Sequence, residues 1–232
     1  TTFNVNAPDT KLSVVASRLG LTFGFGAKLS DNKGAAGDGE YINYDTDKRV
    51  VFLKKEDHGI DLRFTAKNET GREFDEEDAK AFYYYIPVPK KGDNWDTHIQ
   101  DKAFEFNMKM TGPATIGKGN GSDLQVTYST TVDSSKKVGE EGHYNNPNVY
   151  KSAEEITKEG AWSQVKMLRI SAKDSVNCIS MDASETIDIH YEVDREDETQ
   201  EVGALVGSII NFGPCGYSPY AVGNELNGGH MP

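Results

Sequence analysis

The segments LRFTAKNETG (residues 62–71), AFYYYIPVPKKG (81–92) and FEFNMKMTG (104–112) place apolar residues at every second position and end in turn-forming residues. In the third segment the apolar residues are Phe104, Phe106, Met108 and Met110, and the polar ones between them are Glu105, Asn107 and Lys109. A period of two gives a strand one dry face and one wet face, whereas a helix would scatter these side chains around its circumference. The segments therefore predict antiparallel β structure.

The same alternation recurs along the chain. It appears in LGLTFGFGAK (19–28), DLQVTYST (123–130) and ETIDIHYEV (185–193). Short strands separated by turn signals every 8 to 12 residues or so are typical of a β-sandwich. We therefore predict an all-β fold, an antiparallel β-sandwich that is Ig-like or jelly-roll-like. The strand order stays open.

Two segments depart from the simple strand pattern. Pro87 and Pro89 lack the backbone N–H that a central strand needs, so this end of the 81–89 strand is expected at a sheet edge or outside the sheet. Residues 132–160 are polar and are predicted to form a long surface excursion. Within it Ser152 and Glu155 match a capping box, which predicts a short helix at 152–159.

Length and charge bound the domain organisation and the partners. We expect the 232 residues to form a single module, with 1–55 as extra strands of the same sandwich, because so short a piece would be marginal alone. A separate small β unit at 1–55 is the alternative. The net charge of −12 repels phosphate, which argues against nucleic acid as a partner. No run of about 18 apolar residues exists, so no membrane insertion is expected.

Five ordered segments resemble a known family. They are FTAKN (64–68), YIPVPKKG (85–92), FEFNMKMTGPA (104–114), YST (128–130) and WSQVKMLRI (162–170). Together they resemble a module of the cell-wall-anchored surface proteins and adhesins of Gram-positive bacteria, with the best match over residues 60–195.

The resemblance implies an extracellular β module anchored to the cell wall through segments outside this sequence. Such a module is a structural or adhesive element and not an enzyme. As a stalk it would contact other modules of the same surface protein, and as an adhesin it would bind a host protein or a glycan. The sequence does not separate the stalk from the adhesin.

Surface modules of this kind often carry an intramolecular isopeptide bond. The reaction needs a desolvated, neutral lysine that attacks an Asn or Asp side chain, with a nearby carboxylic acid to relay protons. The best pair in this sequence is Lys67 with Asn211, and Glu105 or Asp188 are the acids. The alternative is a solvated lysine and a turn asparagine.

Acidic, oxygen-rich loops suit Ca²⁺, which takes several carboxylate and carbonyl oxygens at once. The candidate ligands are Asp31, Asp38, Glu40, Asp45, Asp47 and Asp194. The alternative is that these loops are solvated. Cys178 and Cys215 share no metal-ligand spacing, and we expect two free thiols, with a disulfide as the alternative.

Exposed aromatic rings are the usual platform for sugars and peptides. Tyr83, Tyr85 and Trp95 are the candidates here, and Trp162 is expected in the core. A line of exposed rings would favour a second function, a carbohydrate-binding accessory domain of a secreted enzyme. A third function, a hydrolase without a recognised motif, predicts a cleft in which histidine and carboxylate groups converge.

Overall fold

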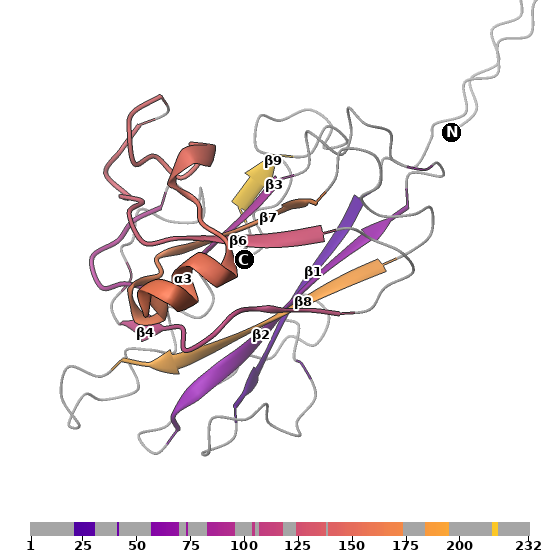
Figure 1. Ribbon diagram of the computed structural model, residues 1–232. Coiled ribbons are helices and arrows are strands. Elements are labelled where there is room, and N and C mark those ends of the chain that lie inside the picture. The colour runs from indigo at the N-terminus through magenta and orange to yellow at the C-terminus, as the bar shows by residue number, and fades with distance from the viewer. Residues whose placement is uncertain are drawn as a thin grey trace, which may run out of the picture.

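The computed structural model describes residues 21–30, 41, 57–69, 73, 83–95, 104, 107–117, 124–137, 139–173, 184–194 and 215–217 (Figure 1). These residues are mostly β, with two antiparallel sheets and one α-helix. This confirms the predicted antiparallel β class. None of the described helices is long and apolar enough to cross a membrane.

The two sheets are built from strands far apart in sequence. The first has the order β1 (Leu21–Leu29), β2 (Gly59–Asn68), β8 (Ser184–Val193) and β4 (Met108–Lys109), and β5 (Thr115–Ile116) also pairs with β8. The second has the order β6 (Leu124–Ser129), β7 (Met167–Ala172), β3 (Tyr83–Pro87) and β9 (Cys215–Tyr217). In Figure 1 the strands of the second sheet cross those of the first at a clear angle.

Alternation determines which side chains of the first sheet are buried. The buried side chains of its two central strands are Ile60, Leu62, Phe64 and Ala66 on β2 and Ile187, Ile189 and Tyr191 on β8. The register aligns the two sets, since Leu62 pairs with Ile189 and Phe64 with Ile187. The polar residues between them consequently lie on the opposite face.

One buried cluster contains side chains from both sheets. The ring of Phe64 on β2 lies 5.0 Å from that of Tyr84 on β3, measured between centroids. The hydroxyl of Tyr191 donates to the carbonyl of Pro87 at 3.3 Å. Each large apolar side chain buried in this way contributes about 1.5–3 kcal/mol. Contacts between the sheets are therefore part of the main core.

Strand β3 is buried on both faces. Tyr84 and Ile86 point into the main core, whereas Tyr85 belongs to a second buried cluster with Trp95, Phe104, Val132 and Met167. The polar composition of residues 132–160 predicted a surface excursion. Part of this segment is instead buried. Val132 is fully buried, and Tyr144, Val149 and Tyr150 pack on this second cluster.

The segment 104–110 differs from the single strand that its alternation predicts. Among the described residues of this segment, only Met108–Lys109 is a strand. Met108 and Met110 join the main core, but Phe104 joins the second cluster and exchanges backbone hydrogen bonds with Gly92 and Asp93. This difference depends on distant parts of the chain, because Phe104 packs in one apolar cluster and Met108 packs in another. Phe106 lies outside the described residues.

Pro87 is the last residue of β3, and Pro89 lies beyond the end of the strand as expected. Among the described strands, β9 pairs with β3 only at Tyr83–Tyr85, and Ile86 and Pro87 pair with β7 alone. The missing N–H of Pro87 therefore falls where β3 has one described neighbour.

The predicted short helix is also confirmed as α3 (Ala153–Glu159). Ser152 accepts a hydrogen bond from the Glu155 N–H, and the Glu155 carboxylate accepts one from the Ser152 N–H, which completes the capping box. Gly160 ends the helix with φ of 63°, a left-handed conformation that favours glycine. Trp162 is only partly buried, and its ring packs edge-on against Tyr128.

Candidate functional site

The outer face of β2 and β8 carries a set of charged side chains. The register places Asp61 beside His190 and Arg63 beside Asp188, and Glu192 lies two residues further along β8. Directly opposite residues of an antiparallel pair lie close enough for their side chains to interact. The alternation that builds the core therefore also assembles this polar group.

Arg63 and Asp188 form a two-point ion pair. Nε of Arg63 lies 2.6 Å from Oδ1 of Asp188, and Nη2 lies 2.7 Å from Oδ2. The hydrogen bonds to Asp188 raise the pKa of Arg63. The side chains of Arg63 and Asp188 are 40% and 32% exposed, so solvent screens the attraction, and the pair mainly fixes the orientation of the two groups.

His190 lies between two carboxylates. Its Nδ1 is 2.7 Å from Oδ1 of Asp61, whose side chain is almost fully buried, and its Nε2 is 3.8 Å from Oε1 of Glu192. The hydrogen bond to Asp61 raises the pKa of His190, and the charges of Asp61 and Glu192 add to this effect against the cost of burial. The protonated imidazolium is therefore favoured up to a higher pH than in a free histidine.

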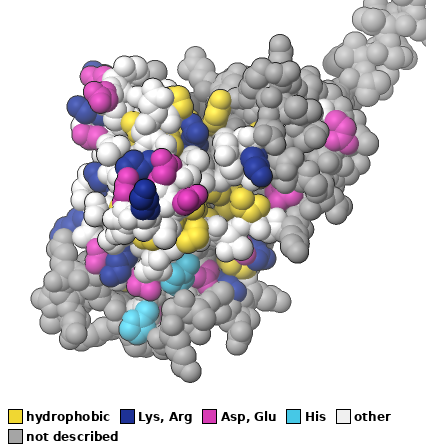
Figure 2. Space-filling model, in the orientation of Figure 1, with side chains coloured by type: hydrophobic (Ala, Val, Ile, Leu, Met, Phe, Trp, Pro, Cys, Tyr) yellow, Lys and Arg dark blue, Asp and Glu magenta, His cyan; other side chains and the backbone are white. Residues whose placement is uncertain are grey.

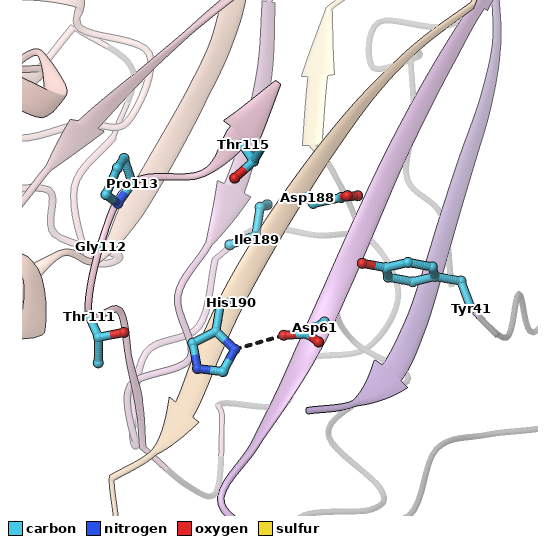
Figure 3. Close-up of a pocket in the computed structure, with 9 residues that line it drawn as sticks. All are labelled: Tyr41, Asp61, Thr111, Gly112, Pro113, Thr115, Asp188, Ile189 and His190. Carbon is cyan, nitrogen blue, oxygen red and sulfur yellow. Dashed lines mark hydrogen bonds and ion pairs between the residues drawn. The ribbon is translucent and has the colours of Figure 1, made fainter. Parts of the chain in front are cut away.

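Tyr41 approaches the same face. Nζ of Lys28 lies 4.7 Å and Cζ of Arg63 lies 4.2 Å from its ring centroid, so both make cation–π contacts. Burial, followed by the charge of Asp188, raises the pKa of Tyr41 to about 12. The hydroxyl of Tyr41 therefore stays neutral, and Figure 3 shows it directed toward the strands that carry Asp61 and Asp188.

A bulge beside β8 forms the opposite wall. Lys109 pairs with Glu192 and Thr115 with Asp188, so the five residues 110–114 lie opposite the three residues 189–191. Extra residues on one strand push that strand away from its partner. The bulge is fixed at both ends, because Met110 is buried and the Ala114 N–H donates to the Tyr128 hydroxyl at 2.9 Å.

An open pocket of about 340 Å³ lies between the bulge, Tyr41 and the two strands (Figure 3). Its lining comprises Tyr41, Asp61, Thr111, Gly112, Pro113, Thr115, Asp188, Ile189 and His190. Acidic and basic side chains are interspersed over the visible face of the molecule, with histidines beside them (Figure 2). The pocket combines hydrogen-bond donors and acceptors with paired charges.

This pocket contains the convergence of histidine and carboxylate groups that the hydrolase interpretation predicts. The hydroxyls that line it belong to Tyr41, Thr111 and Thr115. Asp61 lies 2.7 Å from Nδ1 of His190, whereas Glu192 lies 3.8 Å from Nε2, beyond hydrogen-bonding distance.

The aromatic candidates do not form an exposed platform. Tyr85 and Trp95 are 7% and 4% exposed, and both rings pack edge-on against Tyr144 in the second cluster. Tyr83 is half-buried, and Cζ of Arg169 lies 6.0 Å from its ring. These three residues therefore do not form an exposed line, because side chains of the 132–150 segment cover this face of β3.

The isopeptide candidates are only partly described. Lys67 is half-exposed, and its Nζ lies 2.8 Å from Oε1 of Glu69. It pairs with Ser184, whereas Asp188 is held by Arg63 four positions away on β2. Asn211 and Glu105 lie outside the described residues, so the bond stays a prediction.

Most of the calcium and cysteine candidates also lie outside the described residues. This holds for Asp31, Asp38, Glu40, Asp45, Asp47 and Cys178. Asp194 is described, and its carboxylate lies 3.8 Å from Nζ of Lys109. Cys215 lies on β9. Within the described ranges, no three His, Cys, Asp or Glu side chains are grouped to hold a metal.

Sequence reasoning selected Asp188 only as an acid for a crosslink and missed its place in the pocket. The available signal was the alternate polar positions of IDLRF (60–64) and IDIHY (187–191). Those positions show which residues face outward, but the pairing of two strands more than 100 residues apart is needed to bring them together. Nothing in the sequence places Tyr41 beside them.

In comparisons with known proteins, no family model, curated protein or solved structure matches this chain.

Proposed function

We propose that this chain is an antiparallel β-sandwich module of a Gram-positive cell-surface protein, with a structural or adhesive role outside the cell. One observation carries the proposal: the segments that resemble the surface-protein family form the framework of the two sheets. FTAKN lies on β2, YST at the end of β6, and LRI (168–170) on β7. Phe64, Tyr128 and Leu168 from these segments are all in the main core.

The sandwich arrangement is supported by the contacts between the sheets. Phe64 and Tyr84 touch across them, and Tyr191 reaches the backbone of β3. Sheets that share one buried face in this way are the basis of β-sandwich modules.

Within this proposal, the pocket on β2 and β8 favours the adhesive role over a passive stalk. It is open and carries hydrogen-bonding groups, and one of its walls is fixed by the core through Met110 and Tyr128. A site whose shape exists before binding loses less entropy when a ligand arrives. Host glycans and extracellular proteins are the partners that such a module would meet.

The test is to display the chain between a secretion leader and a wall anchor on a Gram-positive host that does not itself adhere. Cells would be scored for extracellular protease resistance of the displayed chain and for adherence to matrix-coated and glycan-coated surfaces. We expect an intact chain and adherence to at least one surface. Intact chain without adherence would support the stalk, and a chain degraded at the surface would contradict the proposal.

A further inference from the structure

We propose that the pocket between the 110–114 bulge and strands β2 and β8 binds one neutral, hydroxyl-rich unit, such as a single sugar residue of a glycan. This inference rests on the proposed function, because it gives the adhesive role a site and a ligand class. It is carried by the balance of charge, the placement of hydroxyls and the dimensions of the pocket.

The charged side chains of the pocket lining are balanced in pairs. The lining contains Asp61, Asp188 and His190, and Arg63 lies beside Asp188. Asp188 is engaged by Arg63, and Asp61 by His190. An ion that used Asp61 or Asp188 as its counter-charge would compete with His190 or Arg63, whereas a neutral ligand leaves both pairs in place.

The paired aspartates and the hydroxyls around the pocket can still form hydrogen bonds with a ligand. A carboxylate oxygen accepts more than one hydrogen bond, so paired aspartates still accept from a ligand hydroxyl. Thr111 on the bulge and Thr115 on β5 are exposed, and Tyr41 lies across the pocket from them. Each of these hydroxyls both donates and accepts. Donors and acceptors on opposite walls match a ligand with hydroxyls around its rim.

The dimensions agree with this ligand class. The volume of about 340 Å³ is at the small end of ligand pockets, which suits a single ring rather than a long chain. Gly112 carries no side chain, so it takes up less of the pocket than the other residues of the bulge. The anchoring of the bulge by Tyr128 keeps the wall in position before the ligand binds.

The experiment is a titration of the ¹⁵N-labelled full chain with four methyl glycosides, those of glucose, galactose, mannose and N-acetylglucosamine, followed by amide chemical shifts. Calcium chloride and sodium phosphate are titrated in parallel. We expect at least one glycoside to shift the amides of Thr111, Gly112, Ala114, Thr115 and residues 188–190 saturably, with a Kd on the order of 1 mM. The two salts should leave those amides unshifted.

Two variants locate the binding. The double variant Thr111→Val, Thr115→Val keeps the shape of both exposed side chains and removes their hydroxyls, so we expect about tenfold weaker binding. The matched control is Thr65→Val, on the same face of β2 but outside the pocket lining, which should bind as the wild type does. The spectrum of each variant also shows directly whether it is folded.

The inference would be overturned if these amides shifted saturably only with calcium or phosphate, or if no glycoside gave a saturable shift. Equal loss of binding in Thr65→Val would also overturn it. If the chain binds no sugar in the titration but adheres to matrix proteins when displayed on cells, this inference is contradicted and the proposed function is not. A chain that binds sugar but is degraded on the cell surface would instead contradict the proposed function.

Discussion

At the scale of single residues, His190 couples two strands of the first sheet through charge. Asp61 on β2 and Glu192 on β8 face its two ring nitrogens, and the Arg63–Asp188 pair lies beside them. The charged groups facing His190 are thus mainly acidic, which favours its protonated form. The interaction consequently depends on pH.

The sign of that dependence follows from the raised pKa of His190 in the folded chain. A group with a raised folded pKa contributes stability that is complete below its unfolded value of about 6.5 and is lost as the pH rises through its folded value. We expect His190→Gln to lower the free energy of unfolding by about 1 kcal/mol near pH 6 and by less near pH 9. Urea unfolding at both pH values measures this.

His58 provides the control, because its side chain is exposed. His58→Gln should lower the free energy of unfolding by the same small amount at both pH values. If His190→Gln also had the same effect at both, the ion pair with Asp61 would not exist in the folded chain.

Tyr128 connects the second sheet to the bulge. Burial raises its pKa to about 12, and its hydroxyl accepts the Ala114 N–H. Tyr128→Phe keeps the ring but leaves that N–H without its acceptor, so we expect a loss of about 1 kcal/mol in the free energy of unfolding. Faster amide hydrogen exchange at Thr111, Gly112 and Ala114 should accompany it. Tyr191→Phe is the matched control, since it removes another buried hydroxyl and should leave exchange in the bulge unchanged.

At the scale of elements, β3 shows what alternation predicts and what it does not. The period of two correctly separates Tyr84 and Ile86 from Tyr83 and Tyr85. It does not show that the second face is also covered, because the covering segment follows more than 40 residues later. A tyrosine face open to solvent and one buried by a distant loop have the same local sequence.

Burial of Tyr85 predicts its energetic role. Tyr85→Ala should lower the free energy of unfolding by about 3 kcal/mol, because it empties the centre of the second cluster. Tyr83→Ala, at a half-buried position on the same face, should cost clearly less. Equilibrium unfolding of the two variants compares them. Similar small losses would mean that both rings are exposed after all.

Helix α3 illustrates a feature that local sequence does predict. Its cap depends on residues three positions apart, and no distant partner is needed to form it. Ser152→Ala should lower the free energy of unfolding by about 1 kcal/mol. Ser163→Ala, at an exposed serine outside the helix, is the control. Chemical denaturation giving equal values for both would show that the capping box contributes nothing.

At the scale of the whole molecule, most strands and their core-facing positions were predictable, but their assembly and the second buried face of β3 were not. The bulge at 110–114, the meeting of Asp61 with His190 and the position of Tyr41 all depend on register between distant segments. The placement of Phe104 in one cluster and of Met108 in the other also depends on contacts between distant segments. Local periodicity fixes which way a side chain faces and leaves its partner undetermined.

The packing of the two sheets on one core is the central claim, since both the core and the fixed wall of the pocket depend on it. The most direct test is a nuclear Overhauser measurement between the rings of Phe64 and Tyr84 in the folded chain. Their centroids are 5.0 Å apart, so we expect a cross-peak between their ring protons, together with cross-strand peaks between Phe64 and Ile187. Cross-strand peaks within each sheet without any peak between Phe64 and Tyr84 would contradict the account.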